Sequence, residues 1–425
     1  MKQRWKIYTF PIFQQKKELI ESMELFLFEH KKLWRRKGVQ MSVLLCFLYI
    51  VIFGGVLSYQ WFQFGSVKDF TSAFGNRFDG YSNIQAKQQY AGQWTGELTD
   101  DVLQVMVADY QSKAQSDEIS DYEMTDRLTL NSWVRTLWPE LKQTDNPYIM
   151  INYVNPAQLT DFYERRHQAV DDFLELNGQT DKEKEYFLNM DSEVQQPFQY
   201  DWVEGWSEVI ANSVSGYGMI MALFLAVALS SMFSGEWHSN TKPLIATTQN
   251  GWQKIALAKT GVSVAFALEL YAVLAVGTIG AQLVFLGTRG FDMPIQCIKL
   301  IATAPWTMLQ AEIYEYAYLL LSTIGFTGIV LLLSALVKSN FTSLLASLAV
   351  VYVPMAITQF LPLWGQKLLD LIPFVGDSSD IFRTNTYHLF GHIIWSPYLL
   401  ITVPVCVGLV CIPFAIRCWS RRAKT

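Results

Sequence analysis

The feature that most constrains the fold of this chain is a set of six long apolar runs with few charged residues. A helix needs about 20 mostly apolar residues to cross the hydrocarbon core of a bilayer, and the runs approach or exceed that length. Only 17% of all residues are charged, against about 25% in ordinary soluble proteins. We therefore expect an α-helical polytopic membrane protein. The six transmembrane helices are predicted at residues 41–62, 208–233, 255–286, 314–337, 341–361 and 396–418.

The distribution of Lys and Arg predicts the orientation of these spans, because loops rich in them are retained on the cytoplasmic side. Residues 1–40 hold ten basic and four acidic residues, and the end of the chain, RCWSRRAKT, holds four basic residues and no acid. Residues 65–205 hold 25 acidic and 11 basic residues, a balance of −14. We expect a multi-pass protein of the cell membrane with both termini in the cytoplasm and the acidic block outside.

The segments outside the predicted spans divide the rest of the chain. The N-terminal stretch KKELIESMELFLFEHKKLWRRK places apolar residues near one helical face and ends in a basic cluster, a pattern typical of a helix lying in the membrane interface. A soluble helix packed on a partner is the alternative. The expected parts are this helix at 1–40, an extracytoplasmic domain at 63–207, a cytoplasmic segment at 234–254, an outer loop at 287–313, an outer hydrophobic segment at 362–395 and a basic cytoplasmic tail at 419–425.

The extracytoplasmic block is predicted to be mostly helical. Helical apolar spacing runs from Glu97 to Ser116, and a second helix is expected from Asn155, as an N-cap followed by Pro, to Gly178. TDKE at 180–183 has the form of a further helix start, and PYIMINYV at 147–154 is a possible strand. This domain could capture a substrate, bind an outside partner, cover an exit, or only order the ends of the first two spans.

Few motifs in the chain point to chemistry of its own. The sequence has no GxxxxGK[ST] phosphate loop, no GxSxG and no HExxH. HLFGH brings His388 and His392 to one face if the segment is helical, with Asp377 and Asp380 upstream, but these are weak metal candidates and no metal is expected. Nucleic-acid binding is not expected, because the net charge is −5 and no basic face is interleaved with aromatic residues.

Glu269 is an ionisable residue inside the third predicted span. Such a group is costly at that depth and should face the bundle interior, water or a partner. It could be protonated, line a substrate path, or tie the third helix to a neighbour.

The polar, Pro-interrupted stretch MFSGEWHSNTKPLIATTQNGWQKIALAK lies between the second and third spans. It resembles the corresponding stretch of permease subunits of the type-2 ABC transporter family, in which the second span ends at Phe, Glu follows closely, and a short helix leads to a basic residue and a third span that opens with Lys. YDWVEGWSEVI at 200–210 and the overall layout are similar to Gram-positive members. Members often have Gly where this chain has Asn240, and Asn tolerates left-handed backbone better than most residues do. The matching positions are Phe233, Glu236, Leu244, Ile245, Thr247, Thr248, Gly251, Lys254 and Lys259.

The resemblance implies that 234–254 is a coupling helix docking on a separate ATPase subunit. Glu236 and Lys242 would make polar contacts or fix the helix, and Leu244 and Ile245 would supply an apolar anchor. This chain would then be a transport subunit and not an enzyme, with ATP and Mg bound by the partner and no cofactor of its own. A second permease chain, identical or homologous, would complete a complex that exports an amphipathic peptide, lipid-like or drug-like substrate.

Two other interpretations are open. The 234–254 stretch could be only a tight cytoplasmic loop with ordinary interfacial charges. The chain could also be a membrane-anchored receptor or binding protein, in which the outer helical domain carries the function. A receptor would tolerate disruption of 234–254, whereas a transporter would not.

Overall fold

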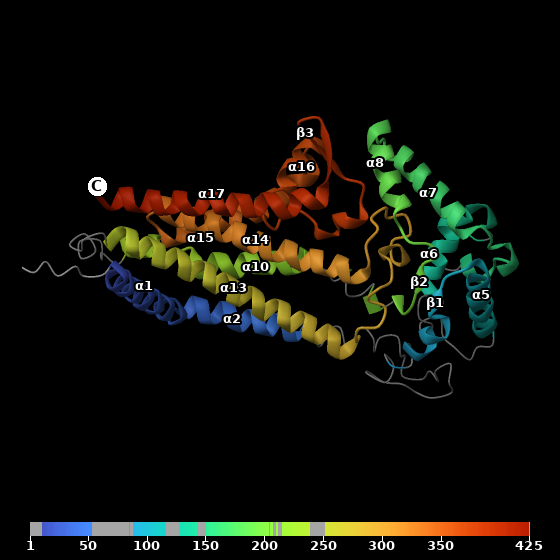
Figure 1. Ribbon diagram of the computed structural model, residues 1–425, viewed down its shortest axis with the longest axis horizontal. Helices are drawn as coiled ribbons and strands as arrows, with labels where there is room; N and C mark the ends of the chain where they lie inside the picture. Colours follow the sequence, from blue (N-terminus) through green and yellow to red (C-terminus); the bar gives the residue numbers. More distant parts are fainter. Residues whose placement is uncertain are drawn as a thin grey trace, which may run out of the picture.

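The computed structural model describes most of the chain as a long helical bundle with a smaller domain at one end (Figure 1). We call this domain, formed by residues 88–206, the head domain. The second half of the first predicted span, the start of the second, and residues 239–250 lie outside the described residues. The described residues are 11–52, 85, 88–115, 127–142, 144, 150–203, 205–206, 210, 215–238 and 251–424.

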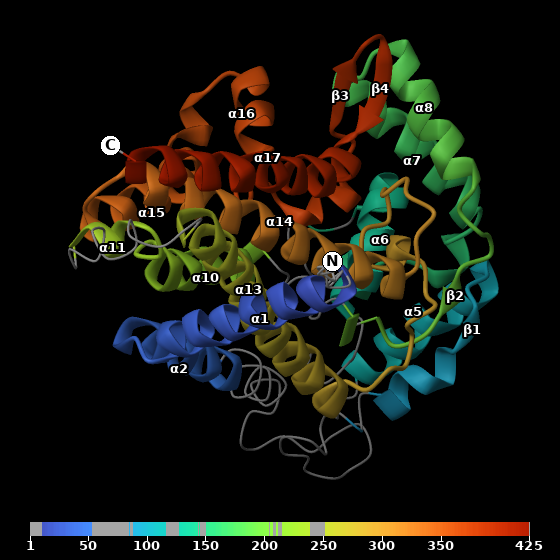
Figure 2. The same ribbon diagram turned by 60° about the vertical axis from the view of Figure 1, so that its left-hand side comes forward.

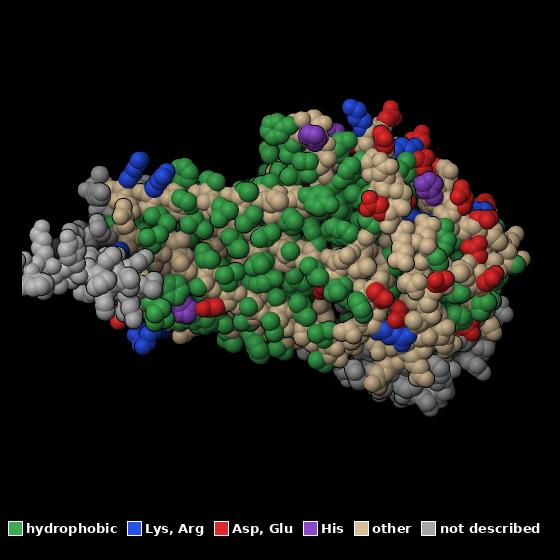
Figure 3. Space-filling model, viewed as in Figure 1, with side chains coloured by type: hydrophobic (Ala, Val, Ile, Leu, Met, Phe, Trp, Pro, Cys, Tyr) green, Lys and Arg blue, Asp and Glu red, His purple; other side chains and the backbone are tan. Residues whose placement is uncertain are grey.

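Within the described residues, five helices are long and apolar enough to cross a membrane. The prediction of an α-helical membrane protein is therefore confirmed. Apolar side chains cover the visible face of the bundle, while charged side chains gather at its ends and over the head domain (Figure 3). The five helices are α10 (Ser215–Leu229) with its continuation to Glu236, α13 (Gly251–Phe285), α14 (Met308–Leu336), α15 (Asn340–Ile357) and α17 (Ser396–Lys424).

Two predicted boundaries need correction. The helix predicted from 314 begins at Met308, because Thr307 and Gln310 form a capping box that satisfies the free N–H groups of the first turn. The helix predicted from 255 begins at Gly251. The last part of the predicted 234–254 segment is therefore the first turn of α13.

The N-terminal part forms helix α1 (Pro11–Trp34), which packs against α13 (Figure 2). A short corner at Arg35 and Arg36 leads into α2 (Lys37–Tyr49), the described part of the first predicted span. Phe26 of α1 contacts Gly261 of α13, where an added Cβ would lie 3.4 Å from its ring. These contacts place α1 along the side of the third span.

The head domain is built from helices around an aromatic core. Trp133, Trp138, Phe162, Phe198 and Tyr200 are fully buried there and form edge-on or tilted ring contacts with one another. The elements are α5 (Asp100–Gln115), α6 (Arg127–Leu137), α7 (Phe162–Leu176), α8 (Asp181–Ser192), the antiparallel strands β1 (Gly96–Glu97) and β2 (Gln199–Tyr200), and single 3-10 turns at Gly92–Trp94, Pro139–Leu141, Met150–Asn152 and Pro156–Gln158.

Several local predictions for this domain can be compared with the structure. The possible strand at 147–154 is wrong where it is described, because Met150–Asn152 is a 3-10 turn held by the Asn131 side chain. Asn155 caps only a 3-10 turn, and α7 begins at Phe162, where the carboxylate of Asp100 accepts bonds from the first free N–H groups. The helix start at Thr180–Glu183 is confirmed as a capping box.

The predicted outer hydrophobic segment contains a short helix and a β-hairpin beside the head domain (Figure 2). Phe390 and Gly391 form the hairpin turn with positive φ angles of 51° and 85°, as tight two-residue hairpins require. The elements are α16 (Leu363–Asp370), a 3-10 turn at Ser378–Phe382, β3 (Thr386–Leu389) and β4 (His392–Trp395).

Helices α14 and α17 approach each other closely through glycine. A Cβ added to Gly328 would lie 2.8 Å from the Cα of Gly408, and one added to Gly325 would lie 2.3 Å from the carbonyl oxygen of Pro404. Small residues permit such backbone contact between membrane helices, where close packing drives association. The backbones of α14 and α17 are therefore in direct contact at these glycines.

We expect Gly328→Leu to lower the free energy of unfolding by about 3 kcal/mol, because the added side chain must push α14 and α17 apart. Thermal unfolding of the purified protein in neutral detergent measures the loss. Gly280→Leu in α13 is the matched control, since a Cβ there meets no atom within 4 Å. Equal melting temperatures for the two variants would contradict the close contact.

Candidate functional site at the end of span two

Helix α10 is followed by a turn and a second, short helix. Helix α10 ends at Leu229, residues 230–233 form a turn, and α11 (Ser234–His238) follows. Ser334 of α14 accepts bonds from the backbone N–H groups of Phe233 and Ser234, and its own hydroxyl donates to the carbonyl of Ser230. The side chain thus satisfies polar groups that the turn leaves without helical partners.

The same turn is attached to two further parts of the chain. The hydroxyl of Ser234 lies 2.6 Å from Oδ1 of Asn340 at the start of α15. Arg36, in the corner between α1 and α2, donates to the hydroxyl of Ser231 at 2.8 Å. The turn that follows α10 is therefore bonded to α14, to α15 and to the α1–α2 corner.

Four charged side chains meet immediately beyond this turn, and we call Glu29, Lys32, Glu236 and Lys259 the ion cluster. The Nζ of Lys259 lies 2.8 Å from Oε1 of Glu236 and 3.0 Å from Oε2 of Glu29. The Nζ of Lys32 lies 2.7 Å from Oε1 of Glu236. Lys259 is 0% exposed, and both carboxylates are also buried. The buried Lys259 and the partly exposed Lys32, whose side chain is 41% exposed, together balance the two buried carboxylates, as burial of charge requires.

The ion cluster links three helices that are distant in sequence. Glu29 and Lys32 belong to α1, Glu236 belongs to α11, and Lys259 lies in the third turn of α13. Displacing α11 without moving α1 and α13 would separate buried opposite charges, which is costly in a low-dielectric environment. The cluster therefore favours joint movement of these three helices.

The predicted site residues fall into two groups. Glu236 is buried in the ion cluster, Gly251 begins α13, and Lys254 is an exposed residue in the first turn of that helix. Lys242, Leu244, Ile245, Thr247 and Thr248 lie outside the described residues. Sequence reasoning missed the roles of Glu29 and Lys32, although their spacing by three residues on a helix was a visible signal.

Glu269 is paired with the same N-terminal helix. Its Oε1 lies 2.9 Å from Nε2 of His30, and its Oε2 accepts a bond of 3.2 Å from the indole N–H of Trp34. Of the three roles considered for Glu269, tying the third span to a neighbour is the one that these contacts display. The neighbour is α1.

The two histidine candidates are arranged differently from the prediction. His388 lies on β3 and His392 on β4, so the expected shared helical face is wrong; the turn at Gly391 reverses the chain between them. Asp377 and Asp380 form ion pairs with Arg383. No group of three potential metal ligands occurs within the part of the chain that the structure describes.

His388 instead bonds to Glu183 at the junction of the hairpin and the head domain. The carboxylate of Glu183 accepts bonds from Thr386 and from its own helix cap at Thr180, and lies 2.9 Å from Nε2 of His388. Burial opposes ionisation of this carboxyl group, but these hydrogen bonds outweigh it and lower the pKa of Glu183 to about 2.

This pKa predicts a dependence of stability on pH. The folded-state pKa lies below the ordinary value of 4.5. The ionised Glu183 carboxylate therefore adds about 2 kcal/mol to the free energy of unfolding, fully above pH 4.5, and this stabilisation is lost as the pH falls toward 2. Glu183→Gln should lower the melting temperature at pH 6 and flatten its fall between pH 5 and about 2.5. Glu164→Gln, at an exposed position on α7, is the control and should retain the wild-type profile. A Glu183→Gln profile parallel to wild type would contradict the assignment.

Comparisons with protein-family models, with curated proteins and with solved structures return no match to this chain. Functional inference therefore rests on the residues themselves. The two strongest observations are the ion cluster at the end of the second span and the sequence pattern that surrounds it.

Proposed function

We propose that this chain is the membrane-spanning permease subunit of an ATP-driven ABC transporter that exports an amphipathic peptide, lipid-like or drug-like substrate. A separate ATPase subunit binds and hydrolyses ATP with Mg and docks on the 234–254 segment. The lack of a phosphate-binding loop in this sequence supports a division of labour between two chains. The observation that carries the proposal is the ion cluster, because it attaches the start of this segment to both α1 and α13.

The transporter is placed in the cell membrane of a Gram-positive bacterium, with six spans per permease chain and both termini in the cytoplasm. Two permease chains, identical or homologous, complete the complex. The 234–254 segment and the ion cluster then lie on the cytoplasmic side, and the head domain lies outside. This orientation follows the excess of Lys and Arg in residues 1–40 and the acidity of residues 65–205.

The contacts of the segment supply a physical route for coupling. A force applied by the ATPase between residues 239 and 250 enters α11 at one end and the first turn of α13 at the other. Glu236 and Lys259 transfer it to α1, and the bonds of Ser334 and Asn340 transfer it to α14 and α15. The helices thus move together when two ATPase subunits close on ATP.

The test is purification of the chain from its native membrane in a mild detergent, with identification of co-purifying proteins. An ATPase with a GxxxxGK[ST] loop should accompany the wild-type chain, and Leu244→Asp combined with Ile245→Asp should release it. Leu176→Asp, at a residue 87% exposed in the head domain, is the control and should retain the ATPase. Absence of an ATPase, or its retention by the double variant, would contradict the proposal.

A membrane-anchored receptor is the second candidate, and one observation favours it. A surface pocket of about 400 Å³ lies between α8 and the β3–β4 hairpin; its walls are about half polar, and Lys182, His388 and His392 are among its lining residues. A receptor that uses this pocket would keep its ligand binding in the Leu244→Asp, Ile245→Asp variant. It would also have no need of an ATPase partner.

A further inference from the structure

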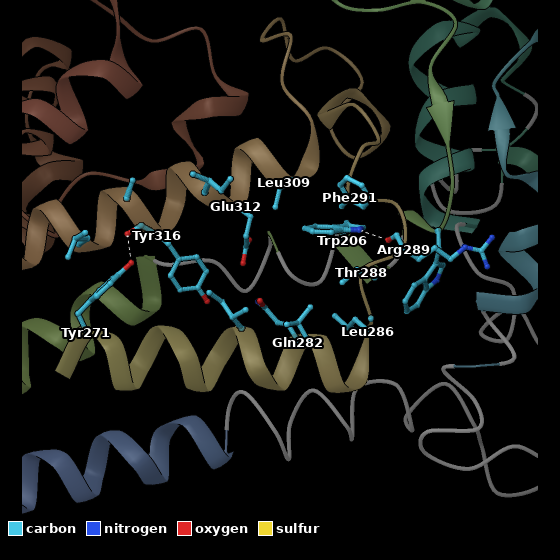
Figure 4. Close-up of a pocket in the computed structure, with 18 residues that line it drawn as sticks. Trp206, Tyr271, Gln282, Leu286, Thr288, Arg289, Phe291, Leu309, Glu312 and Tyr316 are labelled. Carbon is cyan, nitrogen blue, oxygen red and sulfur yellow. Dashed lines mark hydrogen bonds between the residues drawn. The ribbon is translucent and has the colours of Figure 1, made fainter. Parts of the chain in front are cut away.

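A large cavity lies where α13 and α14 meet the head domain (Figure 4). Its volume is about 660 Å³, which is within the range of roughly 300–1,000 Å³ typical of small-molecule sites. Trp202, Trp206 and the loop after α13 close its head-domain end. The cavity is far along α13 from the ion cluster, which involves only the first turns of that helix.

Most of the cavity wall is apolar, and its rim opens on the apolar surface of the bundle. Leu283 of α13 and Ile313 of α14 both line the cavity and are 49% and 59% exposed, while Phe291 at the loop is 48% exposed. Exposed apolar side chains on a membrane-spanning bundle face the hydrocarbon of the bilayer. A ligand can therefore reach the cavity from within the membrane.

Most polar groups around the cavity already have partners inside the protein. The guanidinium of Arg289 pairs with Asp201 at 2.7 Å and also donates to Thr95 and to the carbonyl of Gln88. The hydroxyl of Tyr271 donates to a backbone carbonyl, and the hydroxyl of Tyr316 is bonded to Thr278. None of these groups supplies a spare charge.

Glu312 and Gln282 differ from these residues because their side chains are not bonded to other groups among the described residues. The side chain of Glu312 points from α14 into the cavity, toward Gln282 on α13 (Figure 4). Among the described residues, neither side chain has a hydrogen bond or an ion pair. A carboxylate in an apolar cavity without a partner is unfavourable. The cavity therefore combines an apolar body with one acidic group that has no partner among the described residues.

We propose that this cavity binds an amphiphile with a single cationic head group, of the alkylamine class. The ammonium group lies at the carboxylate of Glu312 and within reach of the amide oxygen of Gln282, and the faces of Trp206 and Phe291 provide further attraction for a cation. The alkyl body lies along Leu283 and Ile313. A neutral lipid chain would leave Glu312 without a partner, and an anionic head group would be repelled by it. The inference goes beyond the proposed function and does not depend on an ATPase.

The test uses the full-length chain in nanodiscs of zwitterionic lipid and a photoactivatable long-chain alkylamine with its diazirine next to the ammonium group. The alcohol of the same chain length is the matched neutral probe. The amine should label residues of the cavity wall in the ranges 279–291 and 309–320, at least about tenfold more strongly than the alcohol does, which corresponds to a difference of about 1.4 kcal/mol. An excess of unlabelled alkylamine should abolish the labelling.

Two variants separate charge from shape. Glu312→Gln keeps the size of the side chain and should reduce amine labelling about tenfold, to the level of the alcohol, while Glu164→Gln, at an exposed carboxylate of the head domain outside the cavity, should leave it unchanged. Ile313→Trp puts a larger side chain on the cavity wall and should weaken labelling by both probes, so it tests the site even if Glu312→Gln is unstable. Equal labelling by amine and alcohol, or amine labelling that survives both cavity variants, would overturn the proposal in favour of a site filled by ordinary lipid.

Discussion

Replacing Lys259 by methionine is expected to lower the free energy of unfolding by about 3–5 kcal/mol, because it removes the cation between two buried carboxylates. Glu236 retains Lys32 at 2.7 Å, but Glu29 would keep only the longer contact of 3.9 Å with that lysine. The remaining pair of like charges would then share one cation in a buried site. Unfolding in mixed micelles, followed by tryptophan fluorescence, measures the loss.

Two further variants show whether charge or packing is responsible. Lys259→Met combined with Glu29→Gln removes the uncompensated carboxylate and should recover more than half of the loss. Arg417→Met, at an exposed position near the end of α17, removes a cation of the same kind without burial and should change stability by about 0.5 kcal/mol or less. A Lys259→Met protein as stable as wild type would show that the ion cluster does not hold these helices together.

The second large effect is expected at Arg166 in the head domain. This residue is 0% exposed; its guanidinium pairs with Asp191 at 2.6 Å and donates to the carbonyl groups of Leu300 and Ala302 in the loop between α13 and α14. Arg166→Leu leaves the Asp191 carboxylate and the Leu300 carbonyl without their donor, while the Ala302 carbonyl keeps the bond from the Gln296 amide. We expect the free energy of unfolding to fall by about 3–5 kcal/mol and proteolysis between residues 287 and 307 to be faster, because a buried carboxylate loses its partner and this loop loses two hydrogen bonds from the head domain.

The neighbouring residue provides the control. Arg165 pairs with Glu140 at 2.6 Å, but both side chains are partly exposed, so Arg165→Leu should cost about 1 kcal/mol or less. Arg166→Leu combined with Asp191→Leu should be more stable than Arg166→Leu alone, because it no longer leaves a buried charge unpaired. Similar losses for the Arg165 and Arg166 variants would contradict the distinction between exposed and buried pairing.

The parts of the fold that were predictable from the sequence are those with local causes. Apolar runs predicted the spans because a helix must be apolar over a fixed length to cross the hydrocarbon core of a bilayer. The capping box at Thr180 was visible in four consecutive residues. The start of α14 was missed because Glu312 was assigned to the outer loop, although Thr307 and Gln310 carry the same capping signal. The start of α7 depends on Asp100, 62 residues earlier, and no local pattern contains it.

The candidate site was predictable to a similar degree. Glu236 and Lys259 were identified from a sequence pattern, and Glu269 from its cost within a span. Their partners were not, because Glu29 is 230 residues from Lys259 and His30 is 239 residues from Glu269. Such pairs form only when the N-terminal helix packs against α13. The cavity at Glu312 was missed for the same reason, since its walls come from separate helices and a loop.

The most direct test of ATPase docking is to place a photo-crosslinking amino acid at Leu244 or Ile245 and irradiate native membranes. Mass spectrometry then identifies the captured chain, and the same amino acid at Phe390, which is fully exposed on the β3–β4 hairpin, serves as the control. We expect capture of a protein with a GxxxxGK[ST] phosphate loop from positions 244 and 245 and not from 390. Capture of only lipid, or only of proteins without that loop, at 244 and 245 would contradict the account.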